Sequence, residues 1–67
     1  MRRDEIRVLP GGYTLYTHFW LNKRWWGVLH FRSEQVATKS GFDTREQALL
    51  WAIEEIERRE GLNANVG

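Results

Sequence analysis

The chain has 67 residues with ten Lys/Arg and nine Asp/Glu, and it contains no cysteine. This length predicts one domain with a small core, and the lack of cysteine excludes disulfide bonds and thiolate metal sites. No apolar run approaches the roughly 18 residues that span a membrane, and residues 1–5 lack the apolar segment of a signal peptide. We therefore expect a soluble, cytoplasmic protein that has no membrane attachment, metal or cofactor.

The charges are distributed unevenly along the chain. Through Arg45 there are eight Lys/Arg and four Asp/Glu, whereas from Glu46 onward there are two Arg and five Glu. Attraction to a polyanion such as nucleic acid is therefore expected from the first part of the chain.

The first nine residues alternate weakly, with Ile6 and Val8 on one side and Arg7 and Leu9 on the other. Residues 10–12, Pro-Gly-Gly, end this segment, because proline and glycine favour turns. Residues 1–12 are expected to form an N-terminal arm or a short strand.

Two runs, 13–21 and 25–32, alternate with the period of β-strands. If residues 22–24 form a three-residue hairpin loop, Leu21 lies opposite Trp25. The same register pairs Trp20 with Trp26, His18 with Val28, and Tyr16 with His30. One face is then an apolar core: Tyr13, Leu15, Thr17, Phe19, Leu21, Trp25, Gly27, Leu29 and Phe31. The other face collects Thr14, Tyr16, His18, Trp20, Trp26, Val28, His30 and Arg32.

A third strand is expected at 35–39, and a helix begins after Asp43 or Thr44, either of which suits the N-cap position. Gly61 suits the C-cap, and residues 62–67 are expected to be a flexible tail. The apolar stripe of the helix consists of Ala48, Leu49, Ala52, Ile53 and Ile56.

These elements predict an α+β domain over residues 13–61, in which a single C-terminal helix packs on one face of a three-stranded antiparallel meander. The other face of the sheet stays open, because two layers cover only one face. Leu50 and Trp51 lie on the flanks of the helix stripe. Trp51 either folds over a sheet edge or belongs to a second contact surface, such as a homodimer interface.

The aromatic residues of the open face have three interpretations. Cross-strand rings can simply stiffen a small sheet. An exposed aromatic patch can instead bind a protein, for which Trp, Tyr and Arg are favoured anchors. The rings can also stack on unpaired bases, and a strand ribbon can enter a major groove. A paired-histidine acid/base site at His18 and His30 is the weakest alternative, because no carboxylate or nucleophile lies clearly beside them. We therefore do not expect an enzyme.

Part of the sequence resembles a known class of DNA-binding domain. The segments that carry the resemblance are Trp26-Gly27-Val28, Lys39-Ser40-Gly41-Phe42-Asp43-Thr44, Glu46-Gln47-Ala48 and Trp51-Ala52. Over residues 13–60 the chain is similar to small β-β-β-α domains, namely the arm-binding N-terminal domains of tyrosine-recombinase integrases and the AP2-type domains of transcription factors. The resemblance implies that the sheet enters the major groove and that DNA contacts come from Arg24, Trp26, Arg32 and Lys39.

The expected function is a small binding module that uses its open aromatic and basic sheet face for nucleic acid, duplex or single-stranded. It would be a DNA-binding protein of phage or mobile-element type. The alternative is a protein-interaction module, either a phage- or mobile-element-encoded protein that docks on a host protein or a homodimer. The candidate binding residues are Tyr16, His18, Trp20, Lys23, Arg24, Trp26, His30, Arg32 and Lys39.

Overall fold

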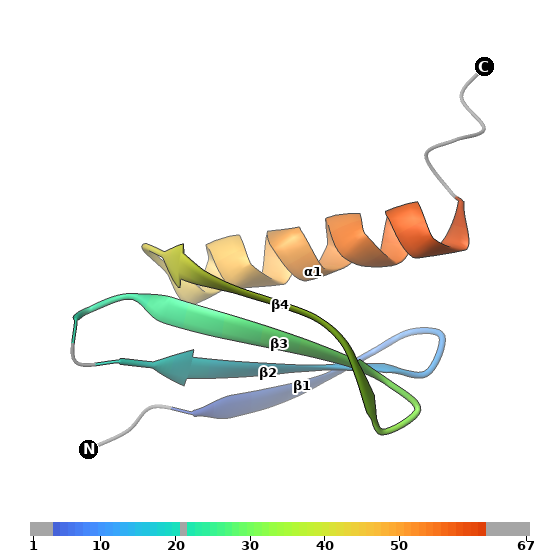
Figure 1. The fold of residues 1–67 in the computed structure, drawn as a ribbon, viewed down its shortest axis with the longest axis horizontal. Coiled ribbons are helices and arrows are strands. Elements are labelled where there is room, and N and C mark those ends of the chain that lie inside the picture. Colours follow the sequence, from blue (N-terminus) through green and yellow to red (C-terminus); the bar gives the residue numbers. More distant parts are fainter. Residues whose placement is uncertain (1–3, 21, 62–67) are drawn as a thin grey trace.

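The computed structural model describes residues 4–20 and 22–61, which form a four-stranded antiparallel sheet and one helix (Figure 1). The elements are β1 (Glu5–Leu9), β2 (Tyr13–Phe19), β3 (Trp25–Phe31), β4 (Glu34–Phe42) and α1 (Arg45–Glu60), with the strands in chain order. The α+β class, the antiparallel meander and the C-terminal helix are confirmed. The prediction of three strands is wrong, because β1 adds a fourth. The predicted flexible tail at 62–67 lies outside the described residues.

The fourth strand arises from the N-terminal segment, which the alternation left open between a strand and an arm. β1 pairs antiparallel with β2, and Leu9 lies opposite Tyr13. The chain reverses at Gly11 and Gly12, whose φ angles of 82° and 90° belong to the left-handed region that glycine adopts without steric cost. The carbonyl of Gly12 also accepts a hydrogen bond of 3.0 Å from the Arg32 amide. The Gly-Gly turn thus returns the chain at the distance that strand pairing requires.

The hairpin between β2 and β3 has a register two residues away from the predicted one. Phe19 lies opposite Trp25, and the Trp20 amide donates to the Arg24 carbonyl at 3.0 Å. The loop is therefore 21–23 and not 22–24, and residue 21 lies outside the described residues. Lys23 adopts a φ of 63°, and the Arg24 amide donates to Asn22 Oδ1 at 3.0 Å. This is the three-residue loop that ends in a left-handed residue. A shift of two leaves every side chain on its predicted face.

β4 is longer than the predicted strand at 35–39, and it pairs with β3 irregularly at two places. Leu29 lies opposite Ala37 while His30 lies opposite Gln35, and Trp26 lies opposite Ser40 while Trp25 lies opposite Phe42. Each irregularity adds one residue to β4, the second of them being Gly41 at a φ of 91°. The extra residue turns Phe42 toward the helix, where its ring lies 5.8 Å from that of Trp51.

The helix begins and ends as the sequence predicts. The Thr44 hydroxyl accepts from the Gln47 amide at 3.2 Å, and Gln47 Oε1 accepts from the Asp43 amide at 2.8 Å. This reciprocal pair satisfies amides that a helix start leaves free. Gly61 ends the helix with a φ of 76°. At the same end, Tyr13 Oη donates to Glu60 Oε2 at 2.6 Å. No helix among the described residues is long and apolar enough to span a membrane.

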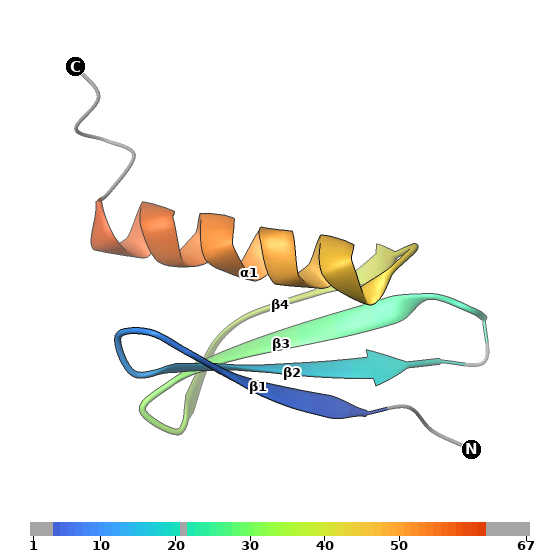
Figure 2. The same ribbon diagram turned by 180° about the vertical axis from the view of Figure 1, so that it is seen from behind.

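The core lies between α1 and one face of the sheet, and Figure 2 shows no described helix or strand on the other face. Its fully buried residues are Tyr13, Leu15, Leu29, Ala48 and Ala52. Trp51 joins this layer, since its indole lies directly on Gly27. Ile53, which the stripe prediction placed in the core, is instead 39% exposed. Trp51 therefore packs on the interior strand β3 and not over a sheet edge, as one of the two predictions had it.

The contact between Trp51 and Gly27 can be tested, because the indole leaves little space for a side chain at residue 27. A Cβ atom at residue 27 would lie 3.0 Å from Trp51 Cζ3 and 3.3 Å from Cε3. We expect Gly27→Ala to lower the free energy of unfolding by about 1–3 kcal/mol, the usual effect of overpacking, as measured by urea denaturation. Adding Trp51→Phe, which removes the crowding ring atoms, should recover part of this loss. A Gly27→Ala variant as stable as the parent protein would contradict the prediction.

Candidate functional site

The candidate site is the face of the sheet opposite α1, where strand alternation places the second set of side chains. β2 contributes Tyr16 and His18, and β3 contributes Trp26, Val28 and His30, because these positions alternate with the buried Leu15, Thr17 and Leu29. Figure 1 shows α1 on one side of the sheet only. We call the group of Tyr16, His18, Trp20, Trp26 and His30 the aromatic face.

The rings of the aromatic face are in contact across β2 and β3. The ring centroids of Tyr16 and His30 lie 4.7 Å apart, those of His18 and Trp26 6.2 Å, and those of Trp20 and Trp26 5.5 Å. Only His18 and Trp26 are direct cross-strand partners; the other pairs meet diagonally, which long aromatic side chains allow. The predicted proximity of Trp20 to Trp26 and of Tyr16 to His30 is therefore confirmed, although they do not lie directly opposite each other.

Hydrogen bonds fix the central indole of this face. Trp26 Nε1 donates to Thr38 Oγ1 at 2.6 Å, and the same hydroxyl donates to the Gly27 carbonyl at 3.1 Å. Thr38 is presented by β4 opposite Val28. The indole is thus held by one polar contact and by two neighbouring rings.

One polar atom of the aromatic face, Nδ1 of His18, is buried. It lies 3.0 Å from Asp4 Oδ1, but no described residue is aligned to form a hydrogen bond with it. Asp4 therefore places a carboxylate beside the imidazole. Among residues 4–20 and 22–61 no group of three or more His, Asp and Glu side chains is placed to hold a metal ion.

The residues that sequence reasoning missed are aliphatic and come from β1. Ile6 lies opposite Tyr16 and Val8 opposite Thr14, so both extend the aromatic face toward the sheet edge. They are 64% and 81% exposed. The available signal was their alternation with Arg7 and Leu9, which mattered only once the segment was known to be a strand. Ile6 and Val8 turn a row of rings into a broader apolar surface.

Most of the predicted basic site residues do not lie with the rings. Arg24 forms an ion pair with Asp43, and Lys39 faces the helix side, with its Nζ atom 5.9 Å from the centre of the Phe42 ring. The guanidinium of Arg32 stands 5.2 Å from the centre of the Phe31 ring, which belongs to the core side. Lys23 is exposed in the loop that follows Trp20. We expected one surface that combines aromatic and basic residues. The structure instead has the aromatic face, with the cations at its margins.

Comparisons of the chain with protein-family models, with curated proteins and with solved structures find no match. The resemblance to β-β-β-α DNA-binding domains therefore stays a prediction from the residues that carry it.

The hydrogen bond between Trp26 and Thr38 can be tested with an isosteric change. We expect Thr38→Val to lower the free energy of unfolding by about 1 kcal/mol, because the indole N–H loses its acceptor. The control is Thr14→Val, the same substitution at a position in β2 that lies on the same face of the sheet as Thr38. Urea denaturation followed by tryptophan fluorescence gives both values, and an equal effect of the two substitutions would argue against an anchoring role for Thr38.

Proposed function

We propose that this chain is a non-enzymatic binding module whose partner lies across the aromatic face. The observation that carries the proposal is the continuity of exposed Ile6 and Val8 with the ring contacts of β2 and β3. Large apolar surfaces of this kind on small soluble domains mark interaction sites. The ring contacts also strengthen the sheet, but stiffening alone does not account for two aliphatic side chains left in solvent.

A protein partner is the first candidate. Interface cores are poor in charged residues and rich in Trp and Tyr, and the aromatic face with Ile6 and Val8 has this composition. Trp20 is 42% exposed at one end of the row and provides a large anchor. A host protein and a second copy of the chain both satisfy this chemistry, and the two are distinguished by sedimentation at increasing protein concentration.

Unpaired nucleic acid is the second candidate, favoured by the rings themselves. Bases stack on aromatic side chains presented by a sheet, and Lys23 next to the Trp20 end supplies a cation for a phosphate. Reading of a duplex groove, as the integrase-like resemblance implies, is less well supported, because Arg24 and Lys39 are directed to Asp43 and Phe42.

One double variant distinguishes a protein partner from unpaired nucleic acid. Ile6→Lys with Val8→Lys changes only exposed positions, so the fold should persist within about 0.5 kcal/mol for each substitution. Two added cations should weaken capture of an apolar protein partner but strengthen binding of a single-stranded oligonucleotide, with a steeper salt dependence. Fluorescence titration with oligonucleotides at several salt concentrations, together with affinity capture from lysate, measures both effects.

The control for these experiments is Glu54→Gln, at an exposed position of α1, and it should change neither result. If the lysine variant captures the same proteins as the parent chain and neither chain binds oligonucleotides at low salt, the aromatic face is not a binding surface. The rings would then serve only to stiffen the sheet.

A further inference from the structure

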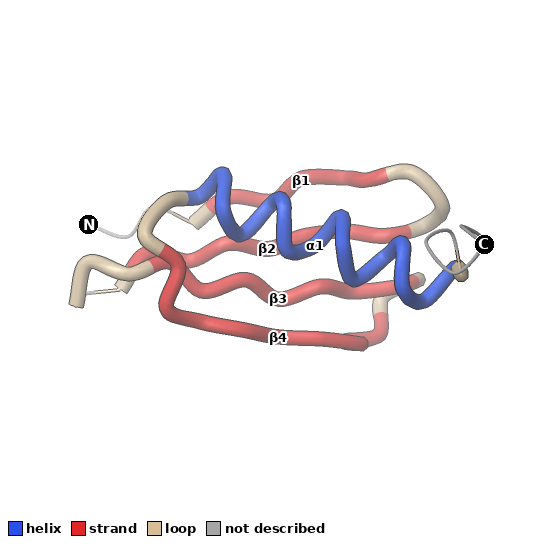
Figure 3. Tube along the Cα trace, turned by 90° about the horizontal axis from the view of Figure 1, so that it is seen from above, coloured by secondary structure: helices blue, strands red, loops and turns tan. Residues whose placement is uncertain are grey.

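The sheet has two edge strands, and they differ in regularity. On β4 the pairing with β3 is irregular at two places, and Gly41 has a positive φ of 91°. Such irregularities protect an edge from pairing with another chain. β1 has no comparable feature, because its five residues pair with β2 in one unbroken register. Figure 3 shows no other described element along the outer side of β1.

The outer edge of β1 presents the backbone groups of Ile6 and Val8. Gly12 and Trp20, which flank β2, form backbone hydrogen bonds with residues that flank β3. Since this direction alternates along an antiparallel strand, the odd-numbered residues of β2 face β1, and their odd-numbered partners in β1 face β2. The N–H and C=O groups of Ile6 and Val8 therefore point outward. Both side chains are exposed and β-branched, which favours an extended strand.

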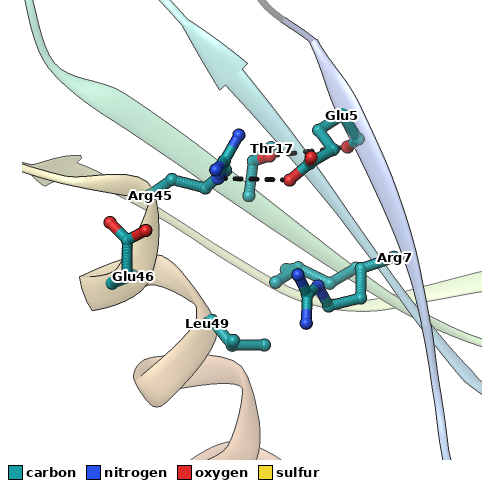
Figure 4. Close-up of a pocket in the computed structure, with 7 residues that line it drawn as sticks. Glu5, Arg7, Thr17, Arg45, Glu46 and Leu49 are labelled. Atoms are coloured by element: carbon teal, nitrogen blue, oxygen red, sulfur yellow. Dashed lines mark hydrogen bonds and ion pairs between the residues drawn. The ribbon is translucent and has the colours of Figure 1, made fainter.

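The charges of β1 are complementary to those of a second copy of the same strand. A two-fold axis at Ile6 pairs the strand antiparallel with itself and places Glu5 of each copy directly opposite Arg7 of the other. Figure 4 shows both side chains on the side of β1 that faces α1, with Glu5 also bound to Arg45 at 3.2 Å. A carboxylate has two oxygens and can accept from a second guanidinium. Opposite charges directly across a strand pair stabilise it.

The other antiparallel registers that bring the outward groups together fit less well. An axis at Arg7 places the two Arg7 side chains opposite each other, and like charges in that position destabilise a strand pair. An axis at Val8 places Ile6 opposite Pro10, which has no N–H to donate. The axis at Ile6 avoids both defects.

The position of α1 leaves room for a second copy at this edge. The backbone of α1 makes no close approach to β1. A two-fold axis perpendicular to the sheet places both helices on the same side, with the two β1 strands between them. Neither helix then obstructs the pairing of the strands.

We propose that two copies of the chain associate through β1, pairing antiparallel about Ile6 and joining two four-stranded sheets into one continuous sheet. The two aromatic faces then lie on the same side of this sheet, with the Ile6 side chains between them. The inference goes beyond the proposed function, because it concerns the edge of the sheet and leaves the aromatic face open.

Reversal of single charges tests the register. Glu5→Lys and Arg7→Glu each place like charges opposite one another, so each variant should self-associate at least about tenfold more weakly than the parent chain. An equimolar mixture of the two variants should restore association, because every Lys or Arg then lies opposite a Glu. Sedimentation velocity at increasing protein concentration measures these samples. Glu54→Lys, the same change of charge at an exposed position of α1, should behave like the parent chain.

Amide hydrogen exchange tests the location. The Ile6 amide points outward and should exchange more slowly as the concentration of the parent chain rises, whereas the Arg7 amide, which faces β2, should change little. Trp20→Ala, on the aromatic face, should leave self-association unchanged. Far-UV circular dichroism establishes that each variant is folded.

Four results would overturn the proposal. A parent chain that stays monomeric, or a mixture no more associated than its components, would show that β1 does not pair with its own copy. Association that is lost in Trp20→Ala would place the second copy on the aromatic face. Glu5→Lys that associates as well as the parent chain would exclude the register about Ile6, because an axis at Arg7 leaves residue 5 opposite Leu9.

Discussion

The packing of Trp51 on Gly27 decides how the two layers of this domain meet. An indole on a glycine lets the helix lie close to the sheet, and the small Ala48 and Ala52 on the same side of α1 permit the same close approach. The helix is therefore centred over β2, β3 and β4. The aromatic face follows from this arrangement, because it lies on the side of the sheet that α1 does not reach, and β1 is the strand to which α1 makes no close backbone approach.

The residues of the aromatic face can stabilise the sheet and also bind a partner. Tyr16, Trp26 and His30 contact other rings across the strands, and such pairs stabilise a hairpin by a few tenths to about 1 kcal/mol each. The same contacts hold the rings in place before any partner arrives, so less side-chain entropy is lost on binding. A structural role and a binding role for these residues are therefore compatible.

Period-two alternation predicted the faces of β2 and β3 correctly even though the predicted register was wrong. A slip of two residues moves each cross-strand partner but keeps every side chain on its face. The slip itself was not predictable, because it depends on Lys23 adopting a left-handed conformation that glycine or asparagine usually supplies. The contacts of Arg24 and Lys39 were not predictable either, because Asp43 and Phe42 reach them only through the irregular end of β4.

β1 contributes to both sides of the sheet, although its alternation in the sequence is weak. The alternation sends Ile6 and Val8 to the aromatic face and Arg7 and Leu9 to the helix side. The strand is held by pairing with β2 on one edge and by the Arg45–Glu5 ion pair, which joins it to the start of α1. Pairing with β2 also places Ile6 opposite Tyr16, whose ring contacts His30. A partner on the aromatic face would therefore meet aliphatic and aromatic side chains that are already in place, so less entropy would be lost on binding.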